Sequence, residues 1–199
     1  MPRAFTAEEK ARIRTALLVA GSEQFATFGV RKTNIADLCA AAGISKGAFY
    51  LFFESKEDLF FELLEQFETA FRRQLLAAAA QPQENPKESF KQMLRESLDL
   101  LETHPLLRAI AGDELPYLLR RVSPERLAAN FQGDSRAVAE LLSYYRAHGT
   151  MQDENPEVIA GLLRALFFVR MHRAEVGEAV FPAVMEMLID MTADRLVGE

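Results

Sequence analysis

Residues Thr33–Phe60, TNIADLCAAAGISKGAFYLFFESKEDLF, decide the fold that we expect for this chain. The stretch holds two short segments with helical periodicity, about 34–41 and 46–52, and then the start of a longer one. Gly43 suits the left-handed residue that ends a helix, and Ser45 can cap the next helix. Two short helices joined by a tight turn form a helix-turn-helix, whose second helix can enter the major groove of DNA. The same shape also occurs as a packing unit that binds no nucleic acid.

The second short segment separates into a packing face and an outward face. Phe49, Phe52 and Phe53 fall at i, i+3 and i+4 and are expected to anchor the helix, and the first segment packs through Ile35, Leu38, Cys39 and Ala42. A recognition helix reads bases with its N-terminal residues, which must be small or polar. Lys46, Gly47 and Ala48 meet that need, and the Tyr50 hydroxyl can reach a phosphate.

Residues on either side of the two short helices are candidates for phosphate contacts. Thr33 is expected to be the N-cap of the first short helix, where its hydroxyl and the free backbone N–H groups can hold a phosphate. Lys56 begins the long helix, where a cation opposes the helix dipole unless an anion docks nearby. Arg31 and Lys32 are either phosphate contacts or solvated surface charges.

The order of residues in this stretch closely resembles that of the TetR/AcrR family of bacterial transcriptional regulators. The matching positions are Thr33, Leu38, Ala42, Gly43, Ile44, Ser45, Gly47, Phe49, Tyr50, Phe53, Lys56, Glu57 and Leu59. Two positions depart: Cys39 replaces an alanine and is expected to be core, and Phe52 replaces a polar residue and is therefore left out of the contacts. The resemblance implies a homodimeric DNA-binding repressor with a small-molecule effector. By that analogy the residues facing DNA are Thr33, Ser45, Lys46, Gly47, Ala48, Tyr50 and Lys56.

The rest of the chain also has helical patterning, so the predicted fold is all-α with about nine or ten helices. We expect a three-helix DNA-binding domain over residues 1–55 and a larger helical effector-binding and dimerisation domain over 56–199. The first helix is expected to begin at Thr6 and to stop at Phe28-Gly29. The other expected segments are 56–80, 86–103, one opened by Pro105 and broken near Asp113-Glu114, 124–132, one from Gly133-Asp134 to His148-Gly149, 156–174 and 178–197.

Composition limits the classes of protein. The 199 residues carry a net charge of −6, are 49% hydrophobic and 26% charged, and include one cysteine. Residues 1–56 hold eight basic and five acidic side chains, so the acidic excess lies in the remainder. We expect no membrane span, no signal peptide and hence a cytoplasmic protein. No metal-ligand spacing, cofactor motif or catalytic set is recognisable, so we expect neither an enzyme nor a metal site.

The last two long helices are apolar on more than one face, which indicates two partners for each. One can be the core of the same chain and the other a second copy, although both faces could also be buried within one chain. The predicted dimer-interface residues are Leu163, Phe167, Phe181, Val184, Met185 and Leu188.

An effector pocket is expected among the helices between about 56 and 173. Its candidate lining, each residue of which could equally be ordinary core, is Phe67, Phe71, Phe90, Met93, Tyr117, Phe131, Tyr144, Phe168, Met171 and His172. This composition favours an apolar or aromatic effector. The predicted partners are therefore an inverted-repeat operator in double-stranded DNA, such an effector and a second copy of the chain. The alternative function is a helical dimerisation module without specific DNA binding.

Overall fold

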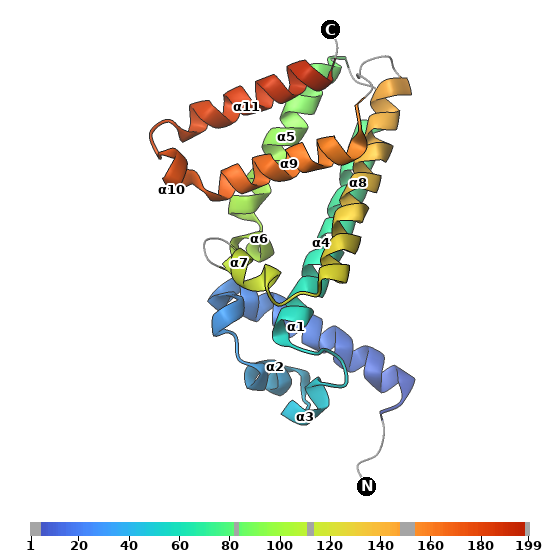
Figure 1. The fold of residues 1–199 in the computed structure, drawn as a ribbon. Helices are drawn as coiled ribbons and strands as arrows, with labels where there is room; N and C mark the ends of the chain where they lie inside the picture. Colours follow the sequence, from blue (N-terminus) through green and yellow to red (C-terminus); the bar gives the residue numbers. More distant parts are fainter. Residues whose placement is uncertain (1–4, 82–83, 111–113, 148–153, 198–199) are drawn as a thin grey trace. The chain divides into compact units, whose positions relative to one another are not determined.

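The computed structural model describes residues 5–81, 84–110, 114–147 and 154–197 and is helical throughout these ranges (Figure 1). No β-strand forms in the described residues, which confirms the all-α prediction. No helix in this part of the chain is long and apolar enough to cross a membrane. The helices are α1 Ala7–Lys32, α2 Ile35–Ala42, α3 Lys46–Phe49, α4 Lys56–Ala79, α5 Pro86–Thr103, α6 Pro105–Arg108, α7 Glu114–Leu119, α8 Pro124–Ala147, α9 Pro156–Met171, α10 Arg173–Val176 and α11 Phe181–Leu196.

The chain forms two compact units, and one sequence-distant segment joins the first of them. Unit 1 comprises residues 1–67 and 105–123, and unit 2 comprises 68–104 and 124–199. Helices α6 and α7 therefore belong to the same unit as the helix-turn-helix, and both contact α1. The predicted domains, 1–55 and 56–199, do not include residues 105–123 in the first unit. That functional division of the chain stays a prediction.

An aromatic cluster forms the core of unit 1. Phe25, Phe49 and Phe60 are fully buried, and the rings of Phe25 and Phe60 meet edge to face with centroids 5.3 Å apart. Gly21 lets α1 approach α4, because a Cβ there would lie 3.0 Å from the Leu59 side chain. Burial of large aromatic rings supplies most of the stability of a small unit. This core fixes α1 and α4 as the frame on which the two short helices sit.

Gly29 interrupts α1 where the sequence predicts its end. Its φ of 75° and ψ of 168° lie in a region that is essentially restricted to glycine. After this kink the chain forms one further turn, Val30–Lys32, and the backbone N–H of Thr33 donates to the Gly29 carbonyl at 3.3 Å. The kink therefore sets the direction in which the chain enters α2.

Unit 2 includes a ladder of ion pairs between α5 and α11, which lie side by side (Figure 1). Basic residues four apart on α5 face acidic residues four apart on α11: Lys87 with Asp194 at 2.8 Å, Lys91 with Asp190 at 2.6 Å and Arg95 with Glu186 at 3.0 Å. The hydrogen bond from Lys87 lowers the pKa of Asp194. Exposed pairs of this kind add little stability each, but together they define the register of the two helices.

Some predicted helix boundaries are wrong, and tertiary contacts explain the largest error. Helix α8 runs unbroken through Gly133-Asp134 because Asp134 pairs with Arg72 of α4 at 2.5 Å and with Arg164 of α9 at 3.4 Å. These contacts offset the roughly 1 kcal/mol that a glycine costs within a helix. The predicted end of that segment, His148-Gly149, lies outside the described residues.

The segment opened by Pro105 is divided as predicted, because α6 ends at Arg108 and α7 begins at Glu114. Pro116 lies in the first turn of α7, where its missing N–H removes no helical hydrogen bond, so α7 continues through it. Asp113 lies outside the described residues. The last long helix begins at Phe181, three residues later than predicted, because α10 and Gly177, with a φ of 111°, intervene after α9.

The conformation of Gly29 gives a direct test of the kink. We expect Gly29→Ala to lower the free energy of unfolding by about 1–3 kcal/mol through backbone strain. Space is not the cause, since the nearest atom to an added Cβ would be a Glu114 oxygen at 3.7 Å. The matched control is Gly47→Ala, at an ordinary φ with no atom within 4 Å of the added Cβ. This control should raise stability by up to about 1 kcal/mol in denaturant titrations, and equal effects of the two substitutions would contradict the assignment.

Candidate DNA-binding site

The turn between α2 and α3 has the geometry that the sequence predicts. Gly43 adopts φ 68° and ψ 32°, and its N–H returns to the carbonyls of α2. An added Cβ at Gly43 would meet no atom within 4 Å, so the backbone conformation alone requires glycine. Ser45 then caps α3, its Oγ accepting from the N–H of Ala48 at 3.3 Å. Helix α3 is shorter than predicted and ends at Phe49, followed by a turn over 50–52.

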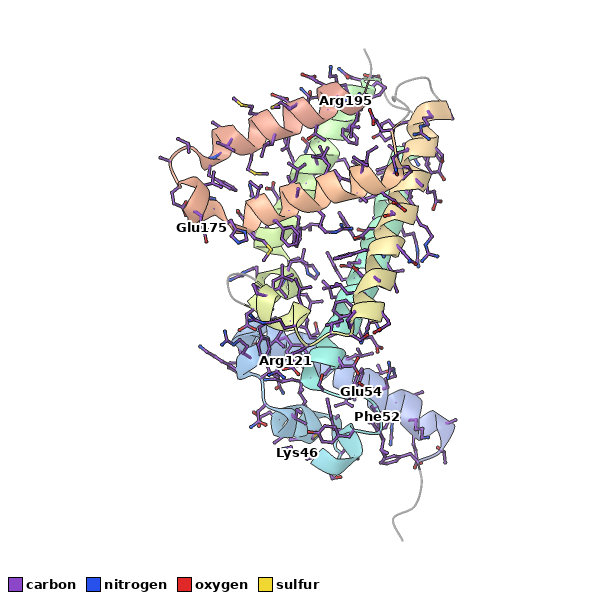
Figure 2. All side chains as sticks on the ribbon, in the orientation of Figure 1. Lys46, Phe52, Glu54, Arg121, Glu175 and Arg195 are labelled. Carbon is purple, nitrogen blue, oxygen red and sulfur yellow. The ribbon has the colours of Figure 1, made fainter. Side chains whose placement is uncertain are left out.

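The packing face of this region is as predicted. Phe49 and Phe53 are buried at 0% and 2% exposure, and Leu38 and Cys39 are buried on α2. Burial raises the pKa of the Cys39 thiol, although Lys46 opposes the shift, so the thiol is disfavoured as a reactive thiolate. Phe52 lies beside Phe5 and its carbonyl accepts from Arg14 Nη1 at 3.2 Å. Figure 2 shows Phe52 next to the start of α1, on the other side of the helix pair from Lys46.

The outward face of α3 is largely exposed. Ser45, Lys46 and Gly47 are exposed, and Ala48 is half-buried. Tyr50 is 53% exposed, and Leu51, which the sequence analysis did not single out, is 68% exposed. Gly47 has neither a positive φ nor an atom within 4 Å of where its Cβ would lie. Nothing in the described chain therefore requires glycine at this position.

Thr33 does not have the predicted role. The N-cap of α2 is Asn34, whose Oδ1 accepts from the N–H of Ala36 at 3.0 Å. Thr33 is only 3% exposed, and its hydroxyl donates to the Gly29 carbonyl at 2.8 Å. The prediction of Thr33 as the N-cap of α2 is wrong, because the side chain closes the α1 kink instead, and the predicted DNA contact of Thr33 stays a prediction. The exposed Asn34 side chain occupies the capping position that sequence analysis assigned one residue too early.

The contacts of Lys56 explain how a cation is accommodated at the start of α4, where it opposes the helix dipole. Its Nζ donates to the carbonyl oxygens of Arg31 at 2.6 Å and Thr33 at 2.8 Å. Burial lowers the pKa of Lys56, while Glu57 and Glu114 act in the opposite direction. The carbonyls at the end of α1 thus supply the partial negative charge that the cation at the start of α4 requires. A phosphate contact by the same ammonium stays a prediction.

The predicted pocket residues are not all in one place. Tyr117 belongs to unit 1, as does Phe67 at its boundary, and the other eight belong to unit 2. His172 is exposed at the C-cap of α9, and Phe168 is 37% exposed, so neither is enclosed in the described chain. Phe90 is 1% exposed and packs edge to face on Tyr145. The remaining candidates are half-buried: Phe71, Met93, Phe131, Tyr144 and Met171.

Two predicted dimer residues are also corrected. Phe181 and Met185 are 0% and 3% exposed within a single chain, so their side chains are not available to a second copy. The other predicted interface residues are half-buried: Leu163, Phe167, Val184 and Leu188. Large apolar side chains are exposed on α9 and on α11, and we refer to them together as the exposed α9–α11 stripe: Val158, Leu162 and Phe168 on α9, Val180 at the N-cap of α11, and Met187 and Met191 on α11.

Comparison with known families matches the helix-turn-helix region. A family model described as "Bacterial regulatory proteins, tetR family" matches residues 17–63. The chain is 30% identical over 98 residues to the HTH-type transcriptional repressor BepR of Brucella suis, covering 49% of this chain and 47% of that protein. It is 40% identical over 58 residues to the probable acrEF/envCD operon repressor of Escherichia coli, covering 29% and 26%. The chain thus spans less than half the length of these relatives in each match.

Solved structures share the fold over nearly the whole chain. A TetR-family regulator from Pectobacterium atrosepticum is 21% identical with a TM-score of 0.70, covering 94% of this chain and 93% of that one. SmeT, the repressor of a Stenotrophomonas maltophilia multidrug efflux pump, is 23% identical with a TM-score of 0.63, covering 94% and 91%. Residues 17–63 thus match the tetR-family model, and the chain as a whole shares the fold of these solved regulators.

Proposed function

We propose that this protein is a transcriptional repressor that binds an inverted-repeat operator as a homodimer and is released by a small-molecule effector. Two of the matched relatives are named as repressors, and the family model matches the region that contains α2 and α3. The function of the whole chain is inferred from this region together with the geometry of α3.

The observation that carries the proposal is the outward face of α3. Gly47 costs helix stability, and neither its backbone angle nor a neighbouring atom requires it. A surface that approaches from outside the chain explains the residue, because only glycine lets a backbone come very close to a partner. Lys46 and Tyr50, exposed on either side of it, add a cation and a hydroxyl for base edges and phosphates. The proposed DNA-facing set is Ser45, Lys46, Gly47, Ala48 and Tyr50, with Lys56 as a further phosphate contact.

A module that only dimerises would not need this face. In such a protein a better helix former at Gly47 would be favoured, and nothing would require the exposed hydroxyl of Tyr50, whose ring packs on Phe49. The outward face of α3 therefore favours DNA binding over the alternative.

A second copy is the partner that we propose for the exposed α9–α11 stripe. On α11 the exposed residues Val180, Met187 and Met191 recur at helical spacing, while the opposite face is buried and a third side pairs with α5. Large contiguous apolar patches on a single protein are characteristic of interaction sites. Two identical patches related by a two-fold axis would place two α3 helices on successive turns of DNA.

We propose that the effector binds in unit 2 among the half-buried aromatic residues Phe71, Phe131 and Tyr144. One of the similar solved structures is the SmeT–triclosan complex, at 20% identity. Aromatic side chains of this kind suit an apolar or aromatic ligand.

Selection from a random pool of duplexes tests DNA binding without knowledge of the regulated gene. The protein should enrich one inverted repeat. Lys46→Ala and Tyr50→Ala should weaken binding to it by at least about tenfold each. Gly47→Ala should weaken binding while leaving the fold at least as stable, since its Cβ has space only when DNA is absent. Arg73→Ala, which removes a charge from an exposed site of unit 2, is the control and should bind normally. Enrichment of no sequence, or full affinity of Gly47→Ala, would refute the proposal.

A charge within the exposed stripe tests the dimer. We expect Met191→Lys to shift sedimentation toward the monomer and to weaken operator binding in parallel, because a cation cannot be buried in an apolar interface without cost. Ala128→Lys introduces the same charge at an exposed position of α8 and should leave the mass unchanged. If Met191→Lys sediments as a dimer at the concentrations at which wild type does, the stripe is not the interface.

A further inference from the structure

Helix α7 belongs to unit 1 although more than fifty residues separate it from the helix-turn-helix. Two of its side chains reach the place where α1 ends and α4 begins. The Tyr117 hydroxyl donates to the carboxylate of Glu57, which is only 4% exposed. The Glu114 carboxylate accepts from the backbone N–H of Arg31 at 3.2 Å. Tyr117, Glu114 and Arg31 all lie outside the family motif in residues 33–60, whereas Glu57 is one of its positions.

The ring of Tyr117 supports two guanidinium groups. Arg31 lies over the ring at 5.3 Å from its centroid and Arg121 at 4.7 Å, and both arginines are exposed on the protein surface (Arg121 is labelled in Figure 2). Stacking on an aromatic face limits the conformations of a flexible arginine while leaving its N–H groups directed to solvent. The Arg31 guanidinium is therefore already ordered before a ligand arrives.

These contacts converge on the α1–α2 joint, which we define as residues 29–33. Gly29 bends the backbone, and Lys56 holds the carbonyls of Arg31 and Thr33. The Glu114 carboxylate accepts from the backbone N–H of Arg31, and the Arg31 guanidinium lies over the Tyr117 ring. The joint leads directly into Asn34, the cap of α2. A joint with a glycine bend at one end needs such supports, because glycine itself restricts the backbone little.

We propose that Tyr117 and Glu114 are positioning residues for operator binding: from outside the helix-turn-helix they fix the α1–α2 joint and hold the Arg31 guanidinium where it meets a DNA phosphate. The inference rests on the proposed function, since it assumes that unit 1 binds DNA. The buried Tyr117–Glu57 hydrogen bond sets the position of the ring, and the ring orders Arg31. Glu114 fixes the backbone of the same residue.

Two substitutions at Tyr117 separate the hydroxyl from the ring. Tyr117→Phe keeps the ring and removes the donor to Glu57, whereas Tyr117→Leu removes both. We expect operator affinity to fall about threefold for Tyr117→Phe and about tenfold for Tyr117→Leu. The salt dependence of binding should lose roughly one unit of slope in Tyr117→Leu and in Arg31→Ala, as for one phosphate contact. Arg31→Ala and Tyr117→Leu should not add in the double variant, because both remove the same contact.

Hydrogen exchange of the free protein gives a second readout that does not require DNA. The backbone N–H groups of residues 31 and 33 should exchange faster in Tyr117→Phe and in Glu114→Gln, while those of α9 keep wild-type protection and show that the chain is folded. Tyr145→Phe removes a tyrosine hydroxyl from unit 2 and should leave exchange in the joint unchanged.

The outcomes distinguish this inference from the proposed function. If wild type binds no specific operator, the proposed function fails whatever the exchange data show. If wild type binds and Tyr117→Leu retains wild-type affinity and salt slope, Tyr117 is a packing residue only and the inference is overturned. Unchanged exchange in the joint of Tyr117→Phe and Glu114→Gln would overturn the positioning role independently of DNA.

Discussion

The hydrogen bonds of Lys56 join the start of α4 to the end of α1, and the DNA-binding geometry depends on this connection. Its ammonium begins α4 and holds two carbonyls at the end of α1, directly ahead of the α2 cap. Without a cation at this point, the carbonyls of Arg31 and Thr33 would lose these hydrogen bonds in a partly buried region. The kink at Gly29 and the Tyr117–Glu57 hydrogen bond lie at the same place, where α1 ends and α4 begins. The placement of α3 depends on these two helices.

Local rules account for what could be predicted from the sequence. The Gly43 turn, the Ser45 cap and the buried faces of Phe49 and Phe53 follow from backbone preference and helical spacing, both of which depend on a few neighbouring residues. The cap of α2 was missed by one residue because Thr33 and Asn34 are both good capping residues. Which of the two caps the helix depends on the Gly29 kink, which turns the Thr33 hydroxyl inward.

Contacts between residues far apart in the chain could not be predicted from helical periodicity. The pattern of α11 indicates several apolar faces but cannot tell which of them meets the same chain, so Phe181 and Met185 were assigned to the partner although they are core. Tyr117 looked like one more aromatic residue of the effector-binding part, and only the packing of α7 on α1 shows its contact with Glu57. Pairings across sixty residues are decided by tertiary structure, which periodicity alone does not encode.

If two copies of α3 read one inverted repeat, a hydroxyl-radical footprint on the selected duplex should show both of them. We expect two protected segments related by the symmetry of the repeat, with centres about 10–10.5 base pairs or a whole multiple apart. A single protected segment, or protection that does not follow the repeat when its half-sites are moved by about half a helical turn, would contradict this expectation.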